Sequence, residues 1–145
     1  MNRKIFLIGG CLGLLISLGV LMANQSASAE AERCYLVSIG DPAQPGAEFT
    51  IKPQDFRVPL ESCVIWVNWS KVAQVQIIFK EGLKCKDATT GATGFTLNSG
   101  VCYVTNYLSH GATSSLVFTK EGMYDYTVES KSGGKLSGKI TVFKE

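Results

Sequence analysis

The sequence predicts an all-β sandwich of seven to eight short strands. Stretches rich in β-branched and aromatic residues recur between glycine, proline and aspartate, a combination typical of sandwich strands. The carboxy-terminal part adds a hairpin from Gly122 to Val142, whose arms alternate apolar and polar residues around an exposed ten-residue loop. The predicted strands are 32–39, 49–58, 64–69, 72–79, 108–118 and the two arms of this hairpin.

Two stretches are expected to depart from regular strands. The stretch 49–58 contains Pro53 and is followed by Pro59, which indicates an edge strand or a bulge because proline has no N–H for the ladder. Residues 81–109 contain four glycines and no sustained alternation. They are predicted to be irregular, with at most one turn of helix.

The first 29 residues have the pattern of a signal peptide. Two basic residues precede an apolar run from Ile5 to Ala23, and a small-residue triplet ends at Ala29. We therefore predict a signal peptide over residues 1–29, cleavage, and export of a single domain over 30–145 to the periplasm, cell surface or extracellular space. The alternative is a retained single-pass anchor, because the apolar run is nearly long enough to cross a membrane.

Charge and motifs exclude two classes of function. Of the 14 basic residues, two lie in the predicted signal peptide, so 12 remain against 12 acidic residues. This balance does not predict nucleic-acid binding, which needs a dense basic face. No nucleophile, zinc-protease, haem-attachment or phosphate-loop motif occurs, and His110 is the single histidine. The sequence therefore predicts neither an enzyme nor a bound cofactor.

Four cysteines follow the predicted signal peptide. They are Cys34, Cys63, Cys85 and Cys102. An even number in an oxidising compartment predicts two disulfides, for which three connectivities are possible. The alternative is a metal site of four thiolates, which is less favoured because zinc sites usually use closely spaced pairs of cysteines. Cys85 and Cys102 bracket much of the irregular stretch, which favours a bridge that closes it.

The hairpin resembles the carboxy-terminal hairpin of the cupredoxins, the blue-copper family. The family pattern is Gly-x-Tyr-x-Tyr-x-Cys-x-x-His-x-x-x-x-Met-x-Gly-x-Ile-x-Val, and this chain matches it without a gap at Gly122, Tyr124, Tyr126, Gly138, Ile140 and Val142. Pro53, Val58, Val64, Trp66 and Asn68 also stand at comparable places. The resemblance implies a cupredoxin-like Greek-key sandwich. Because its first and third strands lie parallel and adjacent, it also implies a Cys34–Cys63 disulfide, which leaves Cys85 to pair with Cys102.

The same alignment places none of the copper ligands of the family in this chain. Val128 takes the position of the cysteine, Lys131 that of one histidine and Leu136 that of the methionine, while Gln74 is nearest to the other histidine. A blue-copper centre needs two imidazoles, a thiolate and an axial thioether. We therefore expect no type-1 copper site and a filled copper cavity. The alternative is a copper-binding electron-transfer protein with non-standard ligands, such as His110, Met123 or free thiols.

The resemblance further implies a partner-binding end. In cupredoxins the loops around copper dock redox partners, and the corresponding positions here are Lys71, Gln74, His110, Lys131 and Lys135. We expect the partner to be a protein or an envelope assembly. A small basic patch around Lys71, Lys131 and Lys135 would bind an acidic protein or an anionic surface polymer, although loop lysines are more commonly just solvated charges. His110 is expected to be an exposed loop residue. Because Trp66 and Trp69 alternate, one of them is expected to face outward.

Overall fold

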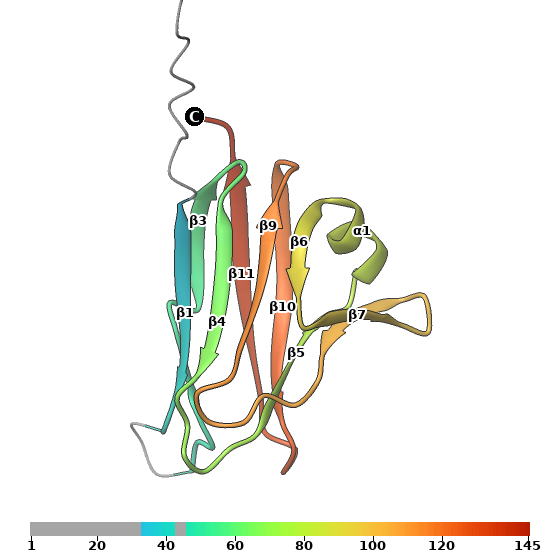
Figure 1. Cartoon of the computed structure of the whole chain (residues 1–145). Coiled ribbons are helices and arrows are strands. Elements are labelled where there is room, and N and C mark those ends of the chain that lie inside the picture. The colour runs from blue at the N-terminus through green and yellow to red at the C-terminus, as the bar shows by residue number, and fades with distance from the viewer. Residues whose placement is uncertain (1–32, 43–45) are drawn as a thin grey trace, which may run out of the picture. The chain divides into compact units, whose positions relative to one another are not determined.

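The structure, a computed structural model, describes residues 33–42 and 46–145 (Figure 1). The predicted signal peptide lies outside these residues. Across the two described ranges no helix is long and apolar enough to span a membrane. The described part forms eleven strands and one short helix, so the predicted all-β sandwich is confirmed, with more strands than the seven or eight expected.

The strands form two sheets packed face to face (Figure 1). Inward-facing apolar side chains of both sheets make one core, in which Trp66, Phe79 and Tyr126 are fully buried. The five-stranded sheet contains, in order, β2 (Thr50–Lys52), β1 (Cys34–Gly40), β4 (Cys63–Asn68), β9 (Thr113–Phe118) and β6 (Thr89–Thr93). The six-stranded sheet contains β3 (Asp55–Pro59), β11 (Lys135–Phe143), β10 (Gly122–Ser130), β5 (Val75–Phe79), β8 (Cys102–Thr105) and β7 (Phe95–Asn98).

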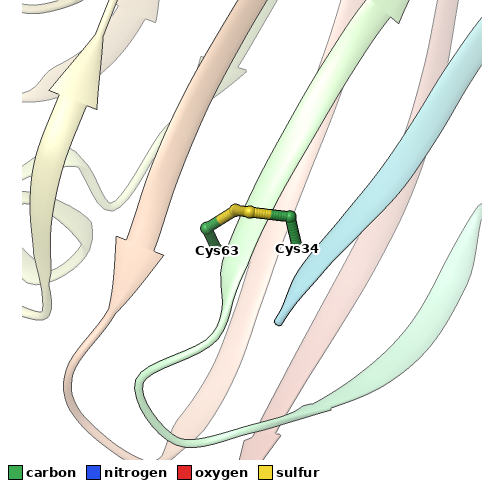
Figure 2. The surroundings of a disulfide bond; sticks show 2 residues. All are labelled: Cys34 and Cys63. Carbon is green, nitrogen blue, oxygen red and sulfur yellow. A yellow bond between two sulfur atoms is a disulfide. The ribbon is translucent and has the colours of Figure 1, made fainter. Parts of the chain in front are cut away.

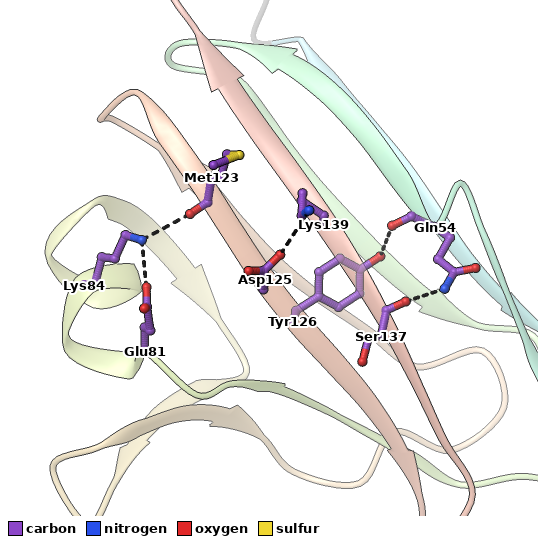
Figure 3. Close-up of polar contacts among 8 residues, drawn as sticks. All are labelled: Gln54, Glu81, Lys84, Met123, Asp125, Tyr126, Ser137 and Lys139. Atoms are coloured by element: carbon purple, nitrogen blue, oxygen red, sulfur yellow. Dashed lines mark hydrogen bonds and ion pairs between the residues drawn. The ribbon is translucent and has the colours of Figure 1, made fainter.

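The predicted single strand over residues 49–58 is two strands, one in each sheet. The chain leaves β2 at Pro53 and enters β3, and both are edge strands, as the prolines indicated. The crossing is fixed by Gln54, whose carbonyl accepts a hydrogen bond from the Tyr126 hydroxyl at 3.2 Å. The side-chain amide of Gln54 donates to the carbonyl of Ser137 (Figure 3).

The expectation that residues 81–109 are irregular is wrong. They contain helix α1 (Gly82–Asp87) followed by β6, β7 and β8. Gly94 and Gly100 lie between strands, and Gly94 has a φ of 78° in the tight connection from β6 to β7. Gly82 starts α1 directly against β8, where an added Cβ would lie 2.3 Å from the backbone nitrogen of Tyr103. Glycine therefore allows the helix to pack closely there.

One of the two predicted disulfides is present. Cys34 and Cys63 lie opposite each other on the parallel strands β1 and β4, with their Cα atoms 4.5 Å apart (Figure 2). The predicted Cys85–Cys102 bridge is wrong, because both residues are free thiols. Cys85 points from α1 into the core and is 1% exposed, whereas Cys102 is half-buried at the start of β8. A site of four thiolates is excluded by the Cys34–Cys63 bond.

We predict that the two free thiols differ in reactivity. Burial raises the pKa of Cys85 to about 12, so its thiolate is scarce near neutral pH and a reagent must also open the core to reach it. Native alkylation at about pH 8, read by peptide mass spectrometry, is expected to modify Cys102 and to spare Cys85 until denaturant is added. Equal labelling of both residues in the folded protein would contradict this placement.

We also predict that the fold loses stability in alkaline solution. Burial raises the pKa of the Cys85 thiol from 9.0 to about 12, and it also raises the pKa of Tyr103, Tyr124 and Tyr126. The folded chain therefore keeps these protons to a higher pH than the unfolded chain. Unfolding then releases protons, so the free energy of unfolding falls as the pH rises from about 9 towards 12.

Urea unfolding at a series of pH values measures this loss. Cys85→Ala removes one of the titrating groups and is expected to make the decline shallower, while Cys102→Ala serves as the matched control. A free energy of unfolding that stays constant between about pH 8 and 11 would show that these groups titrate alike in both states.

Candidate functional site

The tip of the β10–β11 hairpin is tighter than the sequence predicts. The ladder continues through Val128 opposite Leu136 and Glu129 opposite Lys135, which leaves a turn over residues 131–134 in place of the expected ten-residue loop. The N–H of Ser130 donates to the carbonyl of Gly134 at 2.8 Å and closes this turn. Strand pairing has therefore extended into the segment that the resemblance assigned to a ligand loop.

A carboxylate from another part of the chain holds this turn. Glu48 accepts hydrogen bonds from the hydroxyl of Ser130, from the Ser132 hydroxyl at 2.7 Å and from the Gly134 N–H at 3.2 Å. These bonds, with that from Ser130 the largest cause, lower the pKa of Glu48 below its ordinary value. The turn is also tied to the segment just before β5, because the Lys131 N–H donates to the carbonyl of Gln74 at 2.9 Å.

Asn68 organises the two loops beside the turn. It is fully buried at the end of β4. Its side-chain Nδ2 donates to the carbonyls of Ala73 and Leu108, both at 2.8 Å, and its Oδ1 accepts the N–H of Ser70 at 2.9 Å. A single amide thereby joins the loop after β4 to the loop before β9. Figure 1 shows these loops and the hairpin turn at the same end of the sandwich.

The four positions aligned with copper ligands differ in exposure and chemistry. Val128 is fully buried in the core, and Leu136 is partly buried beside it. Lys131 is exposed in the turn. Gln74 is exposed just before β5, and its side-chain amide donates to the Ser109 hydroxyl at 3.4 Å. Val128 and Leu136 pair next to the turn that contains Lys131, and the Lys131 N–H bonds to the Gln74 carbonyl. The four aligned positions therefore lie near the same end of the fold.

The basic residues expected at this end are partly neutralised. Lys135 forms an ion pair with Glu129 at 2.8 Å. Lys71 and Lys131 form no ion pair within the described ranges, but the carboxylates of Asp41 and Glu48 lie close to them through hydrogen bonds to the Lys71 N–H and to the turn. The net positive charge at this end is therefore smaller than the sequence suggested.

Exposed aromatic and apolar side chains are the stronger feature of these loops. Trp69 is 51% exposed, and its ring centroid lies 6.0 Å from that of the exposed His110 in an edge-on arrangement. Val72 is 75% exposed and Tyr107 is 45% exposed on the same two loops. We call these four residues the loop face. The expectation that one of the two tryptophans faces outward is confirmed, since Trp66 is fully buried.

Sequence reasoning missed two members of the loop face. Val72 begins the predicted strand 72–79 and Tyr107 lies just before the predicted strand 108–118, whereas in the structure both lie in the loops that precede β5 and β9. Each stands between one polar neighbour, Lys71 or Asn106, and one apolar neighbour, Ala73 or Leu108. Such residues are usually unremarkable singly. Here Val72 and Tyr107 belong to two loops that the Asn68 side chain joins through its bonds to Ala73 and Leu108.

The described residues hold no group of three or more histidine, cysteine, aspartate or glutamate side chains suited to a metal ion. His110 has an aromatic neighbour in Trp69. Met123 is 60% exposed on β10, at the opposite end of that strand from the hairpin turn. These two residues therefore lie on different parts of the fold.

Comparisons with known proteins support the fold. Protein-family profiles and curated protein sequences give no match. Among solved structures, the chain is similar to an oxidised amicyanin mutant at 18% identity and a TM-score of 0.51, over 76% of this chain and 82% of that chain. It is also similar to a reduced amicyanin mutant at 17% identity and a TM-score of 0.50, over 78% and 85% of the two chains. The chain therefore has a cupredoxin-like fold.

Proposed function

We propose that this chain is an exported cupredoxin-like binding subunit without a type-1 copper centre, and that it contacts its partner through the loop face. The partner is a protein or an envelope assembly. One observation carries the proposal: at the end of the fold where the resemblance expects four copper ligands, the corresponding residues are Gln74, Val128, Lys131 and Leu136. Export rests on the signal-peptide pattern of residues 1–29.

The chemistry of these side chains does not fit copper. Valine and leucine have no donor atoms, and Val128 and Leu136 sit in paired strands against the core. Lys131 supplies a cation where the ligand pattern needs an imidazole. The remaining Gln74 is a weak neutral donor that is already directed at Ser109. We therefore infer that packing, rather than a metal, fills this end of the sandwich.

The loop face has the composition of a protein-binding surface. Interfaces are enriched in tryptophan and tyrosine at their centre and carry charged residues at their rim. Trp69, Tyr107 and Val72 supply exposed apolar area, while Lys71 and Lys131 belong to the surrounding turns. The loops are held by the buried Asn68 bonds, so binding need not order them first.

We predict that copper addition gives no blue centre. Protein purified from cells expressing the full-length chain is expected to show no intense visible thiolate-to-copper band and no stoichiometric copper by metal analysis. Weak binding that disappears in His110→Ala would identify an adventitious imidazole contact. One tightly held copper per chain with an intense visible band would contradict the proposal and favour electron transfer through non-standard ligands.

Partner capture tests the positive part of the proposal. The protein is used as bait in an extract of its own cell envelope, and bound proteins are compared between variants. Trp69→Ser is expected to lose the partner, whereas Met123→Ser, which changes an exposed apolar residue elsewhere, is expected to keep it. Charge reversal at Lys131 measures the electrostatic share through the salt dependence of capture. Equal capture by both serine variants would remove the loop face from the proposal.

A further inference from the structure

The outer face of the five-stranded sheet is almost free of charge. Its strand register fixes which residues share this face, and Lys52 on the edge strand β2 is the single charged residue among them. All other outward positions are apolar, hydroxyl-bearing, glycine or the disulfide. Across the sheet they form three rows, Lys52–Ser38–Val67–Thr113, Leu36–Ile65–Ser115–Thr93 and Cys34–Cys63–Val117–Thr90.

The outer face of the six-stranded sheet provides an internal comparison. Its outward positions carry six charged residues, namely Asp55, Arg57, Asp125, Glu129, Lys135 and Lys139. Several interact with one another, as in the Asp125–Lys139 pair at 3.9 Å (Figure 3) and the Glu129–Lys135 pair at 2.8 Å. That face has the charged surface of a sheet in contact with water. The two outer faces of this sandwich therefore differ in the number of charged residues that they carry.

Apolar side chains are exposed on the uncharged face. Leu36 is 52% exposed, and Ile65 and Val117 on the neighbouring strands are partly exposed. Cross-strand pairing places Leu36 beside Ile65, and Cys63 beside Val117. The disulfide joins β1 to β4 on this same face, which holds the two strands in a fixed relation (Figure 2). The result is a surface whose single charge is Lys52 at its edge and on which Cys63 and Val67 are already buried between their exposed neighbours.

We propose that this face is the contact surface between two copies of the chain. Depletion of charge at the centre is a mark of protein interfaces. A second copy fits because an uncharged face meets its own image without repulsion between like charges and without burying an unpaired ion. The hydroxyls of Ser38, Thr113 and Ser115 can each donate and accept a hydrogen bond, so they are complementary to themselves.

The dimensions set the expected strength. Four inter-strand spacings and about six residues along each strand give a face of about 20 by 20 Å, or about 400 Å² from each copy. Two such faces together fall below about 1,200 Å², the range of weak and transient interfaces. We therefore expect a reversible dimer in which two sheets stack, with a dissociation constant between about 10 μM and 1 mM. This surface shares no residue with the loop face, although Trp69 follows its Val67 by two residues.

Sedimentation equilibrium of the protein from cells expressing the full-length chain tests the proposal. Leu36→Glu is expected to raise the dissociation constant of the dimer at least about tenfold, because the carboxylate would be buried without a partner. The matched control Met123→Glu changes a residue that is 60% exposed on the charged outer face, and it is expected to alter the constant by less than about twofold. Higher salt is expected not to weaken the dimer.

A second variant keeps the test decisive if Leu36→Glu does not fold. Ser115→Lys places a charge at the centre of the same face, next to Ile65, and is expected to have the same effect. A protein that remains monomeric at about 1 mM would overturn the proposal. So would a dimer that both variants leave intact, or a dimer that Trp69→Ser dissociates, since the latter would place the contact on the loop face.

Discussion

Replacing Asn68 with alanine is expected to lower the free energy of unfolding by about 4 kcal/mol, because the Ala73 carbonyl and the Ser70 N–H lose their partner and the Leu108 carbonyl keeps only its bond from the Val75 N–H. The carbonyls of Ala73 and Leu108 and the N–H of Ser70 all bond to this side chain within 2.9 Å. Alanine cannot replace these bonds, and the site is fully buried. A buried backbone group without a partner costs about 1–3 kcal/mol, so the Ala73 carbonyl and the Ser70 N–H account for most of the expected loss.

Urea unfolding measures the total, and hydrogen exchange locates it. Exchange is expected to increase mainly in the loops over 69–74 and 106–112 before the rest of the sandwich opens. Asn68→Asp keeps the shape of the side chain but turns its donor into an acceptor facing two carbonyls, so it should destabilise comparably. Gln74→Ala, which removes one exposed 3.4 Å bond, is the control with an expected change below about 0.5 kcal/mol.

The consequence for binding follows from the same bonds. If the loop face contacts a partner, Asn68→Ala should weaken capture although it removes no residue of that face, because the partner must then order both loops. A loss below about 1 kcal/mol with unchanged exchange in both loops would show that water replaces the amide. Asn68 would then have no organising role.

The fold was predictable where the pattern is local. Alternation of Tyr124, Tyr126 and Val128 is enough to place β10, and the parallel relation of β1 to β4 is enough to pair Cys34 with Cys63. These features depend on residues within one strand or on a topology that the cupredoxin resemblance supplied. The structure confirms them for that reason.

The hairpin turn could not be predicted because its cause lies far away in the sequence. The strands extend to Ser130 and Lys135, and the turn between them is clamped by Glu48, which is 82 residues before Ser130. A glycine-rich segment with several serines is typical of a longer loop when read alone. The tertiary contacts of the turn with Glu48 and with the Gln74 carbonyl hold it in its shorter form, and such contacts leave no periodic signal in the sequence.

The prediction that residues 81–109 are irregular was wrong for a related reason. Its glycines indicated breaks in structure, but Gly82 is needed where α1 meets the backbone of β8. The burial of Cys85 on that helix likewise depends on packing between elements, so its pairing could not be deduced from its place in the sequence. Close approach and burial are tertiary properties. When the tertiary contacts are unknown, glycines indicate loops and paired cysteines indicate disulfide bridges.

Replacing Trp66 with alanine is expected to destabilise the fold by about 4 kcal/mol, since burying a large aromatic side chain contributes its transfer energy and avoids a cavity. Trp66 is fully buried between the sheets. Its ring contacts three others edge-on or nearly so, with centroids 5.6 Å from Phe95, 5.7 Å from Tyr126 and 5.9 Å from Phe79. Because these rings come from β4, β5, β7 and β10, removing it loosens both sheets together.

The chain offers a matched control for this experiment. Trp69→Ala makes the same chemical change three residues later at a position that is 51% exposed, and it is expected to change the free energy of unfolding by less than about 1 kcal/mol. Trp66→Phe keeps an aromatic ring and removes an indole N–H that has no acceptor among the described residues, so it should cost less than half as much as alanine. Equal losses for Trp66→Ala and Trp69→Ala in urea unfolding would contradict the assignment of Trp66 to the core, and with it the packing that positions both outer faces and the loop end.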